Sequence, residues 1–137
     1  MTQRTPPSDH LWSPMSTPPD APYKDVERSI DERLDDLLAR MTTVEKVAQL
    51  GSAWVFQLTD DDELSAQAAK LVADGLGQVT RLCGASGLLP TQAAMVANSI
   101  QKLLAEQTRL GIPVVIHEEI CAGLMARHAT VFPQPIG

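Results

Sequence analysis

The residues best placed to do chemistry are a histidine and two carboxylates that follow a short apolar run. Residues 112–116 (IPVVI) are apolar and rich in β-branched side chains, and His117, Glu118 and Glu119 come directly after them. In parallel α/β folds, functional groups collect at the carboxyl ends of strands. This position favours a site role. From the residues alone, three roles stay open for Glu119: a structural carboxylate, a ligand contact, or a catalytic acid or base.

The two adjacent carboxylates do not form an acid/base pair. Successive side chains of an extended strand point to opposite sides, so Glu118 and Glu119 cannot both face one pocket. We expect one of them to belong to the site and the other to face a neighbouring loop or helix. Arg81, at the end of the preceding candidate strand, is a candidate partner for one carboxylate. His117 is predicted to be a core or hydrogen-bonding histidine.

Other kinds of site find little support in the sequence. The HEE segment is followed by Cys121 and His128, which do not complete the H-E-x-x-H pattern of a helical zinc site. The Gly75-x-Gly77 spacing is too short for a dinucleotide fingerprint, which needs a third glycine and a following helix. No serine lies in a nucleophile elbow. We therefore expect no metal, no cofactor and no catalytic nucleophile in these residues.

Composition narrows the class of protein. The 137 residues carry a net charge of -6, with a pI near 4.9, and an acidic chain is poorly suited to phosphate binding. No window approaches the ~18–20 apolar residues of a membrane span, and the N-terminus lacks the apolar core of a secretory signal. Cys83 and Cys121 have no metal-ligand spacing and are predicted to be reduced thiols. We expect a cytoplasmic protein with a small-molecule partner, no nucleic acid and no membrane.

The chain divides into a proline-rich segment at 1–22, expected to be a disordered or extended arm, and an ordered part at 23–137. An apolar stripe over 30–41, preceded by Ser29 as a candidate N-cap, predicts a helix. Thr42 and Glu45 fit a capping box that opens a second helix with an apolar face. The acidic run 60–63 predicts the start of a third helix that continues to Gly75.

The remaining segments alternate between strand and helix. Residues 52–58 read as a strand or a core-facing loop, and 75–82 as a strand. A long helix is expected from Thr91, its cap, to Gly111, a left-handed C-cap residue. Residues 112–116 predict a strand buried on both faces. This order predicts an α/β fold with two or three parallel strands and four helices. A complete (β/α)8 barrel needs eight strands in about 250 residues, so the chain is a small open sheet or the opening part of something larger.

Several segments in a fixed order resemble the start of glycoside hydrolase family 3. They are DERLDDLLARMTTVEKVAQL, GLGQVTRL, NSIQKLLAEQTRLGIPVVIHEEICAGL and ATVFPQPIG. The likeness covers about residues 23–137 and is nearest the β-glucosidase and β-xylosidase branch. The acidic-Gln-Glu-Gly-Gly segment of the β-N-acetylglucosaminidase branch is replaced here by HEEICAG. The resemblance implies the N-terminal portion of a (β/α)8-type (TIM-type) barrel, ending inside it.

The resemblance also implies a function. Family members are retaining exo-glycosidases in which an Asp nucleophile and a separate acid/base carboxylate act on a glycosidic bond. Both lie beyond the positions matched here, so we expect no catalytic residue and no activity in the chain alone. Glu119 stands where family β-glucosidases carry an Asp that binds sugar hydroxyls in subsite -1, and His117, Glu118 and Arg81 are candidate supporting residues. The longer Glu implies a preference for pentoses such as xylose. A second departure is Ala122, where the glucosidases often have His.

A competing interpretation comes from another class of protein. The 137 residues could be a complete small α/β module that binds a sugar, or another partner, without turning it over. Such a module needs a closed core of its own. A fragment of a barrel instead leaves strand edges and apolar helix faces uncovered, which predicts aggregation or poor folding.

Overall fold

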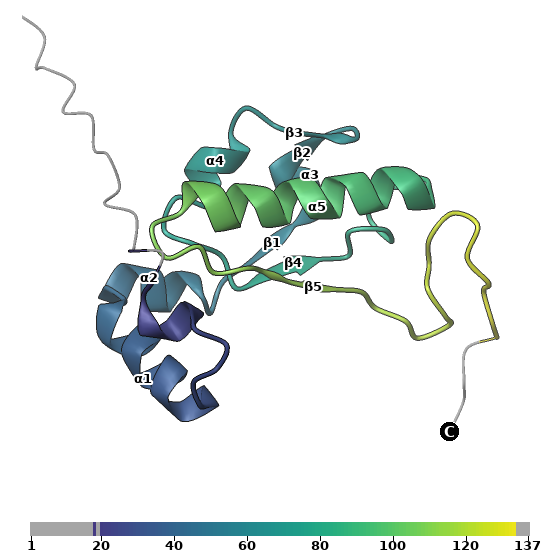
Figure 1. Ribbon diagram of the computed structural model, residues 1–137. Helices are drawn as coiled ribbons and strands as arrows, with labels where there is room; N and C mark the ends of the chain where they lie inside the picture. Colours follow the sequence, from purple (N-terminus) through teal and green to yellow (C-terminus); the bar gives the residue numbers. More distant parts are fainter. Residues whose placement is uncertain (1–17, 19, 134–137) are drawn as a thin grey trace, which may run out of the picture.

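The structure, a computed structural model, describes residue 18 and residues 20–133 (Figure 1). Its centre is a three-stranded parallel sheet in the order β1–β4–β5. The strands are short: β1 is Ser52–Trp54, β4 is Gln78–Thr80 and β5 is Val115–His117. Ala53 pairs with Val79, which pairs with Ile116, so the strands are aligned across the sheet.

One face of the sheet is covered by α5 (Pro90–Gln107), which lies along β4 and β5 in Figure 1. The middle residue of each strand points into this core, with Val79 fully buried and Ala53 and Ile116 partly buried. The opposite face carries the flanking strand residues and has no cover among the described residues. The helix and the connecting segments supply the other core side chains: Val55, Leu58, Ala68, Val72, Leu76, Leu82, Leu88, Ala93, Val96, Ile100, Leu103, Leu104 and Val114.

Two helices lie beyond the end of the sheet at which the strands begin (Figure 1). They are α1 (Ile30–Arg40) and α2 (Thr43–Ala48), preceded by the 3-10 turn η1 (Pro22–Lys24). Both predicted N-caps are confirmed. The Ser29 hydroxyl accepts from the Glu32 backbone N–H, and Thr42 does the same for Glu45. In each box the glutamate carboxylate accepts a hydrogen bond from the backbone N–H of the cap residue.

The apolar face predicted for α2 is not buried among the described residues. Val44 and Val47 are 59% and 62% exposed, whereas Glu45 is buried. On α1, Leu34 and Leu38 are each about half exposed. The apolar stripes are present, but no described element packs over them. These faces need a cover that residues 20–133 do not provide.

The segment after β1 differs from the sequence prediction. Residues 52–58 split into β1 and a one-turn helix, α3 (Val55–Leu58). The acidic run forms a hairpin, with β2 (Thr59–Asp60) paired antiparallel to β3 (Glu63–Leu64), and Asp61 takes a left-handed φ of 55° at its turn. The expected helix shrinks to α4 (Ala68–Leu71). An aspartate run suits a tight turn as well as a helix start, because Asp tolerates positive φ.

The ends of α5 also differ from the prediction. The helix begins at Pro90 after Leu89, not at Thr91; the Leu89 N–H donates to Gln92 Oε1 at 3.0 Å. It ends at Gln107, and Gly111 lies in the following loop. Gly111 does have the expected left-handed φ of 63°, and a Cβ there would lie 2.9 Å from the Ala105 carbonyl oxygen. The glycine therefore allows the chain to turn back from the helix into β5.

The predicted last strand is only partly correct. It spans three residues, and Val115 is 62% exposed, so burial on both faces is wrong for this chain. The reason is the uncovered face of the sheet. The α/β class is confirmed, with three parallel strands and, among the described residues, five α-helices where we expected four. Most of the predicted 1–22 arm lies outside the described residues.

Candidate functional site

The carboxyl ends of the three parallel strands meet at one edge of the sheet. Trp54, Thr80 and His117 are the last residues of their strands and lie in register. A row of hydrogen bonds crosses the uncovered face here: Ser52 Oγ lies 2.7 Å from Thr80 Oγ1, which lies 3.0 Å from His117 Nε2. The prediction of His117 as a hydrogen-bonding histidine is confirmed. The hydrogen bond to Thr80 restricts the orientation of the His117 ring.

Glu118 binds the loop that follows β4. Its carboxylate accepts from the backbone N–H groups of Cys83 and Gly84, the second at 3.2 Å. A Cβ on Gly84 would lie 3.0 Å from Glu118 Oε2, so the close approach favours glycine. Burial, and then the nearby Glu118 charge, raise the pKa of the Cys83 thiol. Cys83 and Cys121 are both free thiols. Glu118 thus fixes the position of the loop that follows β4.

Glu119 faces another way, toward Arg81. Its Oε2 lies 3.5 Å from Arg81 Nη1, and its side chain is 61% exposed. The predicted pairing of Arg81 with one carboxylate is therefore confirmed. The expectation that one glutamate faces a neighbouring loop is met by Glu118. The long ion pair and the exposure leave carboxylate oxygens of Glu119 open to a ligand.

Arg81 has an unusual conformation. Its φ is 53°, in the left-handed region that residues other than glycine rarely adopt. Its Nε is buried without a hydrogen-bond partner. A Cβ on Gly84 would lie 3.3 Å from this nitrogen, so a larger side chain there would press on the guanidinium. Sparsely populated backbone conformations persist where the surroundings impose them, and they cluster at functional sites.

The segment after Glu119 folds back on itself. Gly123 has a φ of 86°, and a Cβ there would lie 2.7 Å from the Thr130 carbonyl oxygen. The Phe132 N–H donates to the Ala122 carbonyl at 2.8 Å. Ala122, the departure noted in the sequence, therefore contributes its backbone to this turn. Gly123 is required by the close approach of the two passes of chain.

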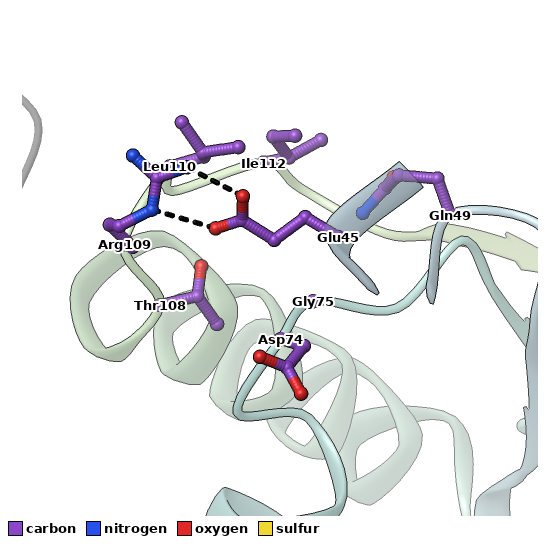
Figure 2. A pocket seen from close by; sticks show the side chains of 8 residues that line it. All are labelled: Glu45, Gln49, Asp74, Gly75, Thr108, Arg109, Leu110 and Ile112. Atoms are coloured by element: carbon purple, nitrogen blue, oxygen red, sulfur yellow. Dashed lines mark hydrogen bonds and ion pairs between the residues drawn. The ribbon is translucent and has the colours of Figure 1, made fainter. Parts of the chain in front are cut away.

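A second cluster of charged residues lies at the opposite edge of the sheet (Figure 2). There Arg109 Nε donates to Glu45 Oε1 at 2.8 Å, and the Arg109 Nη2 also contacts Glu45 and the Arg40 carbonyl. The free space beside this pair is about 10 Å³, the lower limit for one water molecule. The ion pair therefore joins α2 to the end of α5 and does not form a ligand site.

Within residue 18 and residues 20–133, no three His, Cys, Asp or Glu side chains gather as they would around a metal ion. In that same part of the chain, no helix has the length and apolar character needed to cross a membrane.

Comparison with known proteins decides the family. The model of the glycosyl hydrolase family 3 N-terminal domain matches residues 42–137. The chain belongs to this family. Its fold is accordingly a part of an α/β (TIM-type) barrel, and the uncovered face of the sheet corresponds to the interior of such a barrel.

Curated relatives include β-glucosidases and a β-xylosidase. The chain is 39% identical over 127 residues to a probable β-glucosidase C of Aspergillus oryzae and 35% identical over 124 residues to β-glucosidase C of Emericella nidulans. It is 31% identical over 121 residues to a putative β-xylosidase of Formosa agariphila. These matches cover 84%, 84% and 83% of the chain, but only 20%, 20% and 16% of the relatives. The chain thus spans about a fifth of the length of these relatives or less.

Sequence reasoning missed two features of the structure. One is the Glu45–Arg109 pair, because residues 64 positions apart in the chain carry no local signal of contact. The other is a stacked aromatic pair, Trp54 and Phe56, at the carboxyl end of β1. The sequence SAWVFQL does place the two aromatic residues two positions apart. In a strand, that spacing would put both rings on one face. It does not predict the turn between Trp54 and Phe56 that brings the rings into a stack.

Proposed function

We propose that this chain supplies the sugar-binding end of a retaining, exo-acting β-glycosidase of the β-xylosidase or β-glucosidase type. The observation that carries the proposal is Glu119, exposed at the carboxyl end of β5 and held by Arg81. In barrels of this kind the active site is built from the loops at that edge. The substrate is the non-reducing sugar of a plant-type oligosaccharide or glycoside.

Glu119 binds the sugar through its hydroxyl groups. An ionised carboxylate is an acceptor for two or more O–H donors, and such charge-assisted hydrogen bonds are short and strong. Arg81 restricts the carboxylate to one side while its exposed oxygen accepts from the ligand. Glu118 and His117 support this arrangement, one through the Cys83–Gly84 loop and the other through Thr80.

We propose that the 137 residues alone do not hydrolyse glycosides. A retaining mechanism needs two carboxyl groups about 5–5.5 Å apart on either side of the bond, one as nucleophile and one as acid/base. Glu118 accepts from two backbone N–H groups and Glu119 faces Arg81, so the two carboxylates do not face each other across one bond as such a pair must. The purified chain is expected to release no nitrophenol from p-nitrophenyl β-xyloside or β-glucoside above the buffer rate.

The length of Glu119 favours a pentose. One methylene more than the Asp of family glucosidases moves the carboxylate into the space of a hexose hydroxymethyl group. Among the relatives, one is named a β-xylosidase and two β-glucosidases, so both classes are within the family's range. We propose that xylose or arabinose is bound in preference to glucose.

Ligand-observed NMR of the chain with methyl β-D-xylopyranoside and methyl β-D-glucopyranoside tests the proposal. The xyloside should bind more tightly, Glu119→Gln should weaken it roughly tenfold or more, and Glu119→Asp should shift the preference toward the glucoside. The matched control is Glu63→Gln, an exposed glutamate in the β2–β3 hairpin. Equal binding to wild type and Glu119→Gln, or a clear glucoside preference in wild type, would contradict the assignment.

A further inference from the structure

The carboxyl end of β1 carries two aromatic rings that are stacked yet open to solvent. The Trp54 and Phe56 ring centroids are 5.6 Å apart with an angle of 21° between the planes. Trp54 is 39% exposed and Phe56 is 61% exposed. Large aromatic side chains usually dominate cores and interfaces. This pair differs from the exposed apolar side chains of α1 and α2 because it lies at the carboxyl ends of the strands, beside the candidate site.

The backbone fixes where these rings point. Ala53 faces the core under α5, so Trp54 projects to the uncovered face, the same face as Thr80 and His117. Phe56 belongs to α3, whose neighbouring residues Val55 and Leu58 are fully buried. This burial anchors α3 and leaves Phe56 outside.

A hydrogen bond from the backbone of Trp54 to a side chain of α3 reinforces the arrangement. The Trp54 N–H donates to Gln57 Oε1 at 2.8 Å, which closes the first turn of α3. The turn that carries the two rings is thus held by this hydrogen bond and by the buried side chains of Val55 and Leu58. A preorganised surface loses little conformational entropy when a ligand binds.

We infer that Trp54 and Phe56 form an aromatic platform on which the apolar face of one β-configured pyranose ring packs. The inference rests on the proposed function and adds an apolar contact surface to the polar contact that Glu119 makes with the sugar. A ring whose substituents are equatorial presents axial C–H groups on its faces, and these match the electron-rich face of an aromatic ring. Binding sites combine such apolar surface with a few polar groups that fix orientation.

The neighbouring residues match this ligand. Trp54, Thr80 and His117 form one row at the strand ends, and Glu119 follows that row by two residues. A sugar ring on the platform would direct its hydroxyls toward the polar end of the row. Xylose and glucose both suit the platform, because all ring substituents of either β-pyranoside are equatorial. The preference for xylose over glucose therefore rests on Glu119 alone.

Trp54 fluorescence offers a direct test. The chain has two tryptophans, so Trp12→Phe leaves Trp54 as the only indole. Titration of this variant with methyl β-D-xylopyranoside should give a saturable change in emission, whereas sorbitol, a polyol without a ring, should give none. Phe56→Ala and Phe56→Leu should each weaken binding, followed by ligand-observed NMR, roughly threefold to tenfold.

Matched controls separate stacking from folding. Leu50→Ala removes another exposed apolar side chain, at the opposite end of β1, and should leave affinity unchanged. Trp54→Phe keeps a ring and should bind more tightly than Trp54→Ala. Circular dichroism checks that each variant retains the wild-type helical signal.

The outcomes distinguish the platform from the carboxylate. Saturable sugar binding by NMR with flat Trp54 emission, and with unchanged affinity in both Phe56 variants, would overturn the platform and leave the Glu119 assignment standing. It would also indicate that the rings are a contact for the rest of a barrel. No sugar binding by NMR at any concentration tested would overturn the proposed function and the platform together.

Discussion

Glu45 is a buried carboxylate whose role is structural. Its side chain is 9% exposed, and Arg109, whose side chain is 24% exposed, pairs with both of its oxygens. The hydrogen bonds from Arg109, and then those from Thr42, hold the pKa of Glu45 below its ordinary value against the opposing effect of burial. Its location at the amino-terminal edge of the sheet fits the general rule that this edge of a barrel serves stability.

Removing the Glu45 charge should loosen the junction of α2 and α5. Glu45→Gln removes the charge of Glu45 from its ion pair with Arg109, and breaking a partly buried pair in this way costs about 2–4 kcal/mol. Hydrogen exchange at the Gln49 N–H, which donates to the Glu45 carbonyl in the last turn of α2, should accelerate by tenfold or more. Glu27→Gln, an exposed glutamate before α1, is the control and should leave the rate unchanged. Equal exchange in both variants would contradict the structural role.

The lowered pKa of Glu45 also predicts a pH dependence. A carboxyl group whose folded pKa lies below its unfolded value contributes stability above the unfolded pKa, about 4.3, and loses it as the pH falls through the folded pKa. Exchange at the Gln49 N–H, corrected for intrinsic rates, should therefore accelerate below about pH 4 in wild type. Glu45→Gln should show a smaller acid dependence. An identical dependence in the two proteins would assign acid sensitivity to other carboxylates.

At the scale of elements, the sequence predicted correctly those helix starts that depend only on residues a few positions apart. The capping boxes at Ser29 and Thr42 were correct because a cap and its glutamate are only three residues apart. The acidic run 60–63 was predicted to start a helix, but it forms the turn between β2 and β3. That turn depends on the pairing of the two strands, which the charge pattern of the run does not reveal. The Arg81–Glu119 pair could be predicted from the sequence, because the carboxyl ends of parallel strands meet at one edge of the sheet. Arg81's left-handed backbone and its buried Nε had no sequence signal.

Gly77 sets the distance between α2 and the start of β4. A Cβ there would lie 1.9 Å from the Gln49 carbonyl oxygen, a backbone atom that cannot move aside without shifting the end of α2. Gly77→Ala should therefore cost more than about 2–3 kcal/mol and separate β1 from β4. The loss should appear as collapsed dispersion in the amide NMR spectrum. Gly51→Ala meets its nearest atom at 3.2 Å and should be milder; a well-dispersed spectrum for Gly77→Ala would contradict the close approach.

At the scale of the whole molecule, the uncovered sheet face and the apolar sides of α1 and α2 determine how the isolated chain behaves in solution. Val115, Leu34 and Val47 are 62%, 48% and 62% exposed, and such surfaces promote association. We expect the isolated chain to associate in sedimentation velocity and to lose its circular dichroism signal over a broad thermal range. A monomer that unfolds in one sharp cooperative transition would instead support an independent sugar-binding module.

The central claim is that a sugar binds at the carboxyl ends of the parallel strands, with Glu119 as its ligand. Titration of the ¹⁵N-labelled chain with methyl β-D-xylopyranoside, followed by amide NMR, tests it most directly. We expect saturable chemical-shift changes at Glu119, Arg81 and His117, and none at Glu45 and Arg109. Shifts centred on that opposite edge, or none that saturate, would contradict it.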